Sequence, residues 1–267
     1  MRIGAFLLVL FGLTALLGPV LVPLDLTPDY ALRFQPPGWP HLLGTDYAGR
    51  DILAQLVHGS RDIMVIAFLS GALATAMALV VGVGAALAGG WRDAVLSTVV
   101  DVLLTVPTFP VMAILAALLR VEDAFSFALV LSLWSWPALA RSLRAQVLSL
   151  KRREFLEAAY VLCMSRWHIL TREILPNILP SVTLSFINLT RGAITASVGI
   201  MLLGLVPLRV DNWGMMLNLA AFQSGAIFLP HAWSYLLSPL LAIVLFQWAL
   251  IQLARGLEER FDPRLHA

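Results

Sequence analysis

Charged residues are scarce in this sequence. They make up 13% of its 267 residues, whereas hydrophobic residues make up 60%. Soluble globular domains carry about 25% charged and about 45–50% apolar residues. This composition excludes an ordinary soluble enzyme, a disordered chain and a nucleic-acid-binding protein, and it predicts a chain surrounded by a lipid bilayer.

Cysteine and lysine are almost absent as well. Cys163 is the only cysteine, which excludes a disulfide framework and any cysteine-based zinc or iron–sulfur site. Lys151 is the only lysine, and no G-x-x-x-x-G-K-[ST] loop for nucleotide phosphates surrounds it. The motifs H-E-x-x-H and G-x-S-x-G are missing, and the five histidines are scattered without ligand spacing. We therefore expect no catalytic residue, no metal site and no bound cofactor in this chain.

Long hydrophobic runs are abundant instead. A membrane-spanning helix needs about 20 mostly apolar residues to cross the hydrocarbon layer. Six segments qualify: residues 3–22, 63–88, 96–119, 125–139, 179–206 and 236–253. The first also fits a secretory signal peptide, but no small-x-small cleavage site closes it. We predict an all-α membrane protein with six transmembrane helices.

The few positive charges orient these helices, because cytoplasmic flanks are enriched in lysine and arginine. With an inside amino terminus, twelve of the 18 basic residues fall in inside segments and five in outside segments. Arg191 falls within a span. Both termini are therefore predicted to be cytoplasmic.

Three connections between the spans are longer than turns. Residues 23–62 and 207–235 are external, and residues 140–178 are cytoplasmic and carry seven of the twelve inside positive charges. Long loops in compact proteins are usually functional.

The cytoplasmic connection predicts two short helices joined by a turn. Residues 148–162 form the first helix, and Ser165 is placed to cap the second, which is expected to end near Pro176. Small residues such as Ala158 and Ala159 allow a helix to sit closely in a groove of a partner. The alternative is an amphipathic helix-turn that lies at the membrane interface and only covers the bundle.

This connection carries the first resemblance to a known family. Glu157-Ala158-Ala159, followed after the turn by Ile169 and Pro176, resembles the "EAA" loop of ABC importer permeases. In that family the loop forms the coupling helix that docks into a cleft on the ATP-hydrolysing subunit.

Three other stretches resemble the dipeptide, oligopeptide and nickel subgroup of these permeases. They are Asn212-Trp213-Gly214-Met215-Met216 after residues 203–205, the carboxyl end at 262–265, and the external stretch 43–51. The external motif comprises Gly44, Thr45, Asp46, Gly49, Arg50 and Asp51. The motifs follow one another in the expected order and together cover almost the whole chain.

The resemblance implies a type I ABC importer permease fold in a bacterial or archaeal plasma membrane. Residues 1–62 would form an amino-terminal helix with an extracytoplasmic segment, 63–257 the permease domain including the coupling loop 140–178, and 258–267 a cytoplasmic tail. The implied partners are a second homologous permease, two ATP-binding subunits that hold ATP and Mg, and an extracytoplasmic solute-binding protein. Nucleic acid is not a partner.

Two residues of the coupling loop depart from the family pattern. Cys163 stands where the family usually has glycine, which suits a left-handed residue at the end of a helix. Either the turn differs, or a backbone strain of about 1 kcal/mol is tolerated. Glu173 stands where the family often has a basic residue or histidine.

Ionisable residues within spans are candidates for the translocation path, because burying a charge in a membrane is costly. Asp101 and Arg191 are the two, and Arg191 has Asn188 and Thr195 beside it on a span that the family places along the path. The alternative is that Arg191 or Asp101 only pins helices together through an ion pair or a carbonyl contact.

The sequence leaves the transported solute open. The expected function is the permease subunit of a binding-protein-dependent importer of dipeptides or oligopeptides, with nickel or metal-chelate uptake as the alternative. Met201, Met215, Met216 and His231 near the outer face suit either metal contacts or ordinary packing. A stand-alone secondary transporter, a channel or a docking scaffold are more distant alternatives.

Overall fold

The computed structural model describes residues 2–119 and 121–261, which include Arg191, the coupling loop 140–178 and the external motif 43–51. The predicted carboxyl-terminal motif at 262–265 lies outside these residues. The described residues form helices and no strands, apart from one isolated antiparallel bridge between Thr45 and Asp51. The main helices are α1 (Arg2–Leu21), α2 (Ile52–Ala78), α3 (Gly84–Ala88), α4 (Gly90–Thr105), α5 (Thr108–Leu118), α6 (Ala124–Ser135), α7 (Pro137–Leu150), α8 (Glu154–Val161), α9 (Arg166–His168), α10 (Leu175–Leu202), α11 (Trp213–Asn218) and α12 (Trp233–Phe261).

Four continuous helices are long and apolar enough to cross a membrane, namely Ile3–Leu21, Ile52–Ala88, Arg166–Leu202 and Pro230–Phe261. Two further candidates are bent pairs: α4 and α5 meet at 88°, and α6 and α7 at 48°. The all-helical prediction is confirmed. The predicted number of six spans corresponds to counting each bent pair as one crossing.

Proline accounts for both bends. Val106, which precedes Pro107, has an extended backbone, as the residue before a proline prefers, so α4 ends there. Pro137 begins α7, where its missing N–H costs no helical hydrogen bond. The sequence placed both prolines within or beside spans but did not give the size of the bends.

Several predicted boundaries are wrong. The helix that carries the second span starts at Ile52, eleven residues before the predicted span start at residue 63, because Asp51 caps α2 by accepting a hydrogen bond from the Ala54 amide at 2.8 Å. The predicted helix 148–162 is interrupted, since α7 ends at Leu150 and α8 starts at Glu154.

The second cytoplasmic helix does not end near Pro176. A wider turn of helix over Ile169–Ile174 links α9 to α10, so one helix runs over Arg166–Leu202. Pro176 lies in the first turn of α10, directly after this wider turn, and the helix continues past it.

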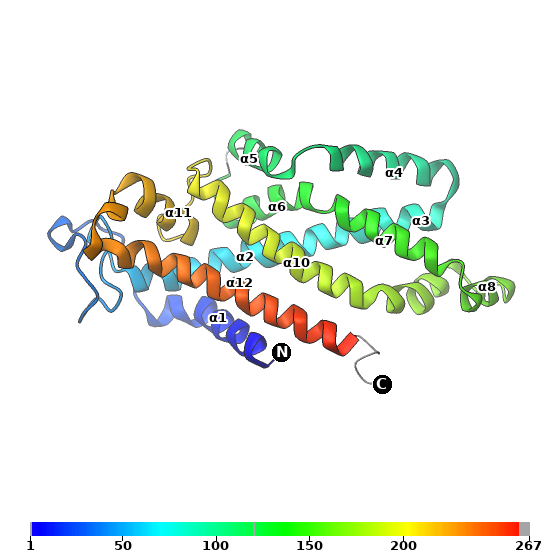
Figure 1. The fold of residues 1–267 in the computed structure, drawn as a ribbon, viewed down its shortest axis with the longest axis horizontal. Coiled ribbons are helices and arrows are strands. Elements are labelled where there is room, and N and C mark those ends of the chain that lie inside the picture. Colours follow the sequence, from blue (N-terminus) through cyan, green and yellow to red (C-terminus); the bar gives the residue numbers. More distant parts are fainter. Residues whose placement is uncertain (1, 120, 262–267) are drawn as a thin grey trace.

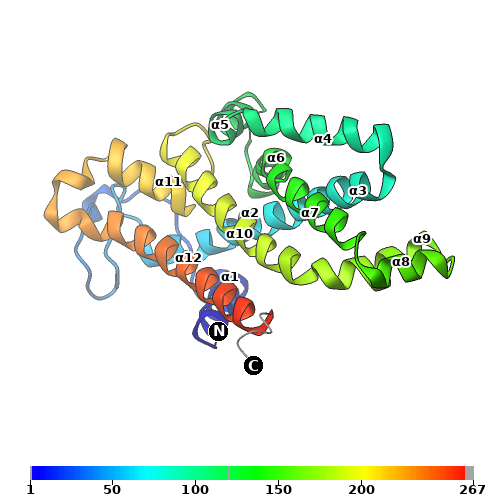
Figure 2. The ribbon, with the colours of Figure 1, turned by 45° about the vertical axis from the view of Figure 1, so that its right-hand side comes forward.

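The helices form an elongated bundle with α2 in its middle (Figure 1). Helix α2 packs against α10, α6 and α1, and α1 also packs along α12. The start of α1 lies beside the end of α12, since Gly4 approaches Ala249 and Leu253. The connections that precede α2 and α12 gather at one end of the bundle, and α8 and α9 project at the other (Figure 2).

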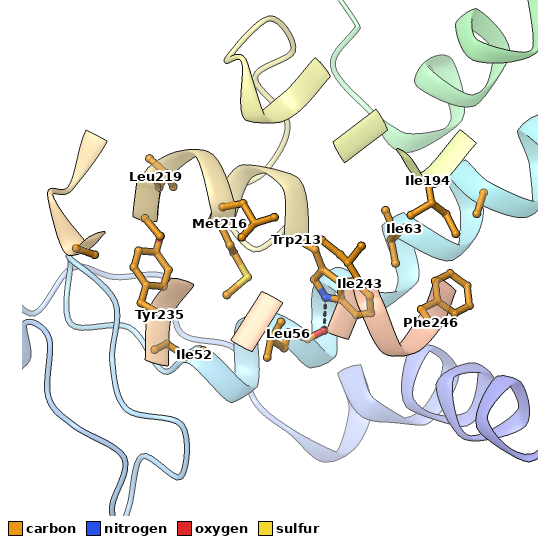
Figure 3. Close-up of a cluster of buried hydrophobic side chains, with 14 of the residues drawn as sticks. Ile52, Leu56, Ile63, Ile194, Trp213, Met216, Leu219, Tyr235, Ile243 and Phe246 are labelled. Atoms are coloured by element: carbon orange, nitrogen blue, oxygen red, sulfur yellow. Dashed lines mark hydrogen bonds between the residues drawn. The ribbon is translucent and has the colours of Figure 1, made fainter. Parts of the chain in front are cut away.

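Three apolar clusters hold the bundle together. The first fills the end near α11, where Trp213 packs edge-on against Phe246 and its indole N–H donates to the Leu56 carbonyl at 2.9 Å (Figure 3). The second lies at the α8 end and includes Leu143 and Ile174. The third joins α5, α6 and α10.

Candidate functional site

The predicted site residues fall into three separate groups along the bundle. The coupling motif is at the α8 end, the external motif precedes α2 at the opposite end, and Arg191 lies between them on α10. Any role of these groups in one process therefore requires communication along the helices rather than a single shared pocket.

The coupling motif divides into buried and exposed residues. Leu156 and Ala159 of α8 are buried and belong to the same cluster as Ile169 and Ile174. Glu157 and Ala158 are exposed. Helix α8 is thus fixed to the base of the long helix by one face and presents its Glu157 face outward.

The tip of this segment exposes large apolar side chains. Val161 is 81% exposed and Trp167 is 73% exposed. Phe155, Leu162 and Met164 are exposed as well. Clustered apolar residues on a projecting surface mark interaction sites. We call this set, Phe155, Val161, Leu162, Met164 and Trp167, the apolar tip; the "EAA" pattern does not include it, although its residues surround the motif in the sequence.

The turn between α8 and α9 keeps the conformation that glycine would favour. Cys163 has a φ of 52°, and the Met164 amide donates to the Ala159 carbonyl at 3.1 Å, which is a Schellman helix end. Ser165 caps α9 as predicted, because its side chain accepts from the His168 amide at 3.2 Å. Of the two possibilities for Cys163, the structure shows the strained one.

Arg191 lies in a groove between α10 and α12. The groove has a volume of about 770 Å³, and Asn188, Thr195 and Gln247 line it together with Arg191. The Arg191 side chain donates to Asn188 Oδ1 at 3.3 Å, and Gln247 Nε2 donates to the Arg191 carbonyl at 3.1 Å and to Thr195 Oγ1 at 3.1 Å. The three predicted path residues are therefore brought together in one polar strip.

Asp101, the other ionisable candidate, faces a different helix. Its carboxylate lies 3.6 Å from Arg141 of α7, and both side chains are more than half exposed. On the same two helices, Asp93 accepts two hydrogen bonds from Arg144 at 2.5 and 2.7 Å. Asp101 thus belongs to an α4–α7 pairing and not to the Arg191 groove.

The external motif forms a compact hydrogen-bond network. Asp46 is fully buried and accepts from the amides of Ala48 and Arg50 at 2.8 and 2.9 Å and from Gln55 Nε2 at 3.1 Å. Thr45 Oγ1 accepts from the Gln35 amide at 2.8 Å and donates to the Leu32 carbonyl.

The remaining motif residues connect this network to Leu26, to His41 and to the start of α2. Arg50 donates to the Leu26 carbonyl at 2.9 Å, and Asp51 accepts from His41 at 2.8 Å while it caps α2. Gly44 and Gly49 both have positive φ, and a Cβ on Gly49 would collide with the Asp29 carbonyl oxygen. The motif therefore fixes the start of α2.

Within the second external connection, 207–235, which was expected to be a loop, residues 211–220 are all buried. Asn212 caps α11 by accepting from the Gly214 amide at 3.1 Å, and Trp213 is 2% exposed. Just before it, Arg209 donates to Asp211 at 3.0 and 3.2 Å, and this bonding raises the pKa of the Arg209 guanidinium.

The methionines considered as metal contacts pack in the core. Met216 belongs to the cluster around Trp213, whereas Met201 and Met215 belong to the cluster of α5, α6 and α10. His231 is exposed. Across residues 2–119 and 121–261, no three His, Cys, Asp or Glu side chains are grouped so that they could hold a metal ion.

Comparison with known proteins assigns the chain to a family. The family described as binding-protein-dependent transport system inner membrane component matches residues 78–267. The chain belongs to this family. It is therefore an ABC importer permease and a multi-pass inner-membrane protein, and the matched region includes the coupling motif and the Arg191 groove.

Relatives of this permease share most of its length. A putative peptide permease protein of Brucella suis biovar 1 (strain 1330) is 35% identical over 229 residues, which is 85% of this chain and 74% of the relative. A putative peptide transport system permease protein of the same organism is 30% identical over 269 residues, covering 99% and 88%. The oligopeptide transport system permease protein OppC of Mycobacterium tuberculosis (strain H37Rv) is 34% identical over 177 residues, covering 66% and 61%.

A solved structure has the same fold as this permease. The MetNI methionine ABC transporter in an inward-facing conformation matches with a TM-score of 0.61 and 16% identity, over 77% of this chain and 97% of that chain. The identity is low, so the match supports the fold alone.

A cavity lies where the bent spans of the permease meet. It has a volume of about 240 Å³ and is lined by residues from both bends, including Thr108 and Pro137. Ser70 Oγ and Trp134 Nε1 are buried without a hydrogen-bond partner, and both residues line it. Gly192 lines this cavity and the Arg191 groove, so the two adjoin on α10.

Proposed function

We propose that this chain is the membrane subunit through which an ATP-driven, binding-protein-dependent importer moves dipeptides or oligopeptides. The observation that carries the proposal is the apolar tip beside exposed Glu157, at the projecting end of an ABC importer permease. The relatives described as peptide permeases support the choice of solute.

The proposed topology has six crossings with both termini in the cytoplasm. Each bent pair then counts as one crossing, and the α8 end lies in the cytoplasm. The excess of basic residues in the segments assigned to that side supports this orientation. In this scheme residues 1–62 carry the first helix and the external motif, 63–257 form the permease domain with the coupling loop 140–178, and 258–267 form the tail.

The coupling loop is proposed to dock into an ATPase subunit. Glu157 and Ala158 would contact a cleft of that subunit together with the apolar tip. Ala159 and Ile169 would hold the segment against the bundle, Cys163 would form its turn, and Pro176 would follow it in α10. The helix Arg166–Leu202 starts in this segment and carries Asn188, Arg191 and Thr195. A movement imposed by the ATPase at the tip therefore reaches the groove through one continuous helix.

The proposed assembly contains this chain, a second homologous permease, two ATP-binding subunits and an extracytoplasmic solute-binding protein in a bacterial or archaeal plasma membrane. ATP and Mg would be held by the ATPase subunits, and this chain would carry out no covalent chemistry. Nickel uptake is less well supported, because Met201, Met215 and Met216 are divided between two apolar clusters.

Reconstitution of the whole importer tests this proposal. With ATP inside the vesicles and loaded binding protein outside, tri-alanine uptake should require nucleotide. Glu157→Lys should reduce uptake at least about tenfold, because a reversed charge on the docking face opposes the partner contact. Glu258→Lys makes the same change on an exposed position of α12 and should leave uptake near that of the unaltered importer.

Two results would contradict the proposal. Uptake that proceeds without nucleotide would favour a stand-alone transporter or channel. Equal uptake by the Glu157→Lys and unaltered importers would indicate that the segment does not couple to ATP hydrolysis.

A further inference from the structure

Arg191 carries a positive charge at membrane depth. It lies eleven residues before Leu202, the last residue of α10, which corresponds to about 16 Å along a helix. In the proposed topology α10 crosses the membrane and Leu202 lies at its outer surface. The hydrocarbon layer is about 30 Å thick, so Arg191 lies near its middle in that topology. A charge at this depth is retained where it faces a water-filled cavity or a partner of opposite charge.

The side chain of Arg191 is only partly satisfied. Its one side-chain hydrogen bond goes to Asn188 Oδ1 at 3.3 Å, and its Nε is buried without a partner. Within residues 2–119 and 121–261 no carboxylate forms an ion pair with it, since Asp93 and Asp101 pair with arginines of α7. The guanidinium therefore keeps free donors and an uncompensated charge.

The groove beside Arg191 is large enough to admit a solute. Its volume of about 770 Å³ exceeds the 240 Å³ of the cavity at the bends, and its walls away from the polar strip are apolar, formed by Val198, Ile243, Val244, Trp248 and Ile251. Arg191 thus faces open space between apolar walls.

We propose that Arg191 recognises the carboxylate of the peptide as it passes the groove between α10 and α12. The inference rests on the proposed function and adds to it the chemical feature of the solute that the membrane path selects. A guanidinium matches a carboxylate with two parallel hydrogen bonds, and every unblocked peptide carries a carboxyl-terminal carboxylate at neutral pH. Asn188, which holds one end of the guanidinium, is a positioning residue in this scheme.

The first test measures whether the groove attracts anions, without any peptide. Cys163 is the only cysteine of the chain, so Cys163→Ser with Thr195→Cys gives a single thiol one helical turn from Arg191. In the assembled importer, an anionic methanethiosulfonate should modify this thiol at least about tenfold faster than a cationic one. Adding Arg191→Gln should bring the two rates within about twofold.

Cys163 itself provides the control. It is exposed at the far end of the bundle. Because it lies in the segment proposed to dock into the ATPase, this control is measured on the importer stripped of its ATPase subunits, for the chain that keeps Cys163 and lacks Thr195→Cys. Arg191→Gln should leave the ratio of the two rates unchanged there. Equal rates at position 195 in the presence of Arg191, or no modification there at all, would overturn the inference.

The second test asks whether the attraction acts on the solute. Uptake of tri-alanine is compared with uptake of tri-alanine amide at equal loading of the binding protein. The unaltered importer should favour the free acid at least about fivefold, Arg191→Gln should remove this preference, and Arg191→Lys should restore part of it.

The outcomes separate the inference from the proposed function. If Arg191→Gln lowers uptake of both peptides by the same factor, Arg191 pairs with a carboxylate of another subunit and the inference is wrong. If the unaltered importer takes up no peptide, the proposed function fails, and the thiol-labelling rates alone then decide whether Arg191 attracts anions.

Discussion

The two predicted motif regions, at opposite ends of the bundle, differ in burial. At the α2 end, Asp46 is fully buried and accepts three hydrogen bonds, so its motif holds the chain in shape. At the α8 end, Glu157 and Ala158 are exposed, and the apolar tip around them is held to the bundle through Leu156 and Ala159. One predicted motif therefore stabilises the fold locally, whereas the other leaves Glu157 and the surrounding apolar side chains exposed.

The largest expected effect is a loss of stability on removing Asp46 from the buried hydrogen-bond network. Asp46→Ala leaves two amides and the Gln55 side chain without their acceptor, and it should lower the free energy of unfolding by about 3 kcal/mol. Thermal unfolding of the detergent-solubilised importer measures this as a lower Tm. Asp25→Ala, which removes an exposed carboxylate bonded only within its own turn, is the control and should change the Tm far less. Equal Tm shifts for the two variants would show that the hydrogen-bond network does not stabilise the fold.

Truncating a side chain of the apolar tip should have an intermediate effect, weakening association with the ATPase subunit without lowering the stability of the chain. Trp167→Ala should weaken association with the ATPase subunit by about 2 kcal/mol, or about 30-fold, because exposed tryptophans often dominate interfaces. Co-purification over a range of ATPase concentrations measures it, with the Tm of the isolated chain as a check. Trp233→Ala, an exposed tryptophan at the opposite end, should leave the association intact. If both variants bind alike, the apolar tip is not the docking surface.

The smallest prediction concerns the turn that follows Glu157. Cys163→Gly should raise stability by about 1 kcal/mol, because glycine adopts the left-handed backbone at φ 52° without strain. Cys163→Ala keeps the strain and serves as the control. Unfolding in denaturant, followed for both variants, distinguishes them, and a less stable glycine variant would mean that the thiol contributes a contact that outweighs the strain.

Much of the fold follows from the sequence because long apolar runs have few alternatives in a membrane. All six predicted segments lie in helices or bent helix pairs, and Ser165 caps α9 as expected. The path residues Asn188, Arg191 and Thr195 also share a face because they recur at helical spacing.

The errors come from contacts that are distant in sequence or from context around proline. Helix α2 starts eleven residues before the apolar run, because Asp51 caps it there and because Arg61 and Asp62 interrupt an apolar run without interrupting a helix. Pro176 fails to end a helix because a wider turn precedes it. The burial of Trp213 depends on Leu56 and Phe246, which no local pattern of residues identifies.

The continuous helix Arg166–Leu202 has the geometry of a lever. Its base lies in the segment proposed to be gripped by the ATPase, and Arg191 is 25 residues further along, or about 38 Å. A tilt of about 5° at the base displaces Arg191 sideways by about 3 Å, which is comparable to the length of one hydrogen bond. A small rotation at the base of this helix is therefore amplified into a displacement large enough to make or break a contact in the groove.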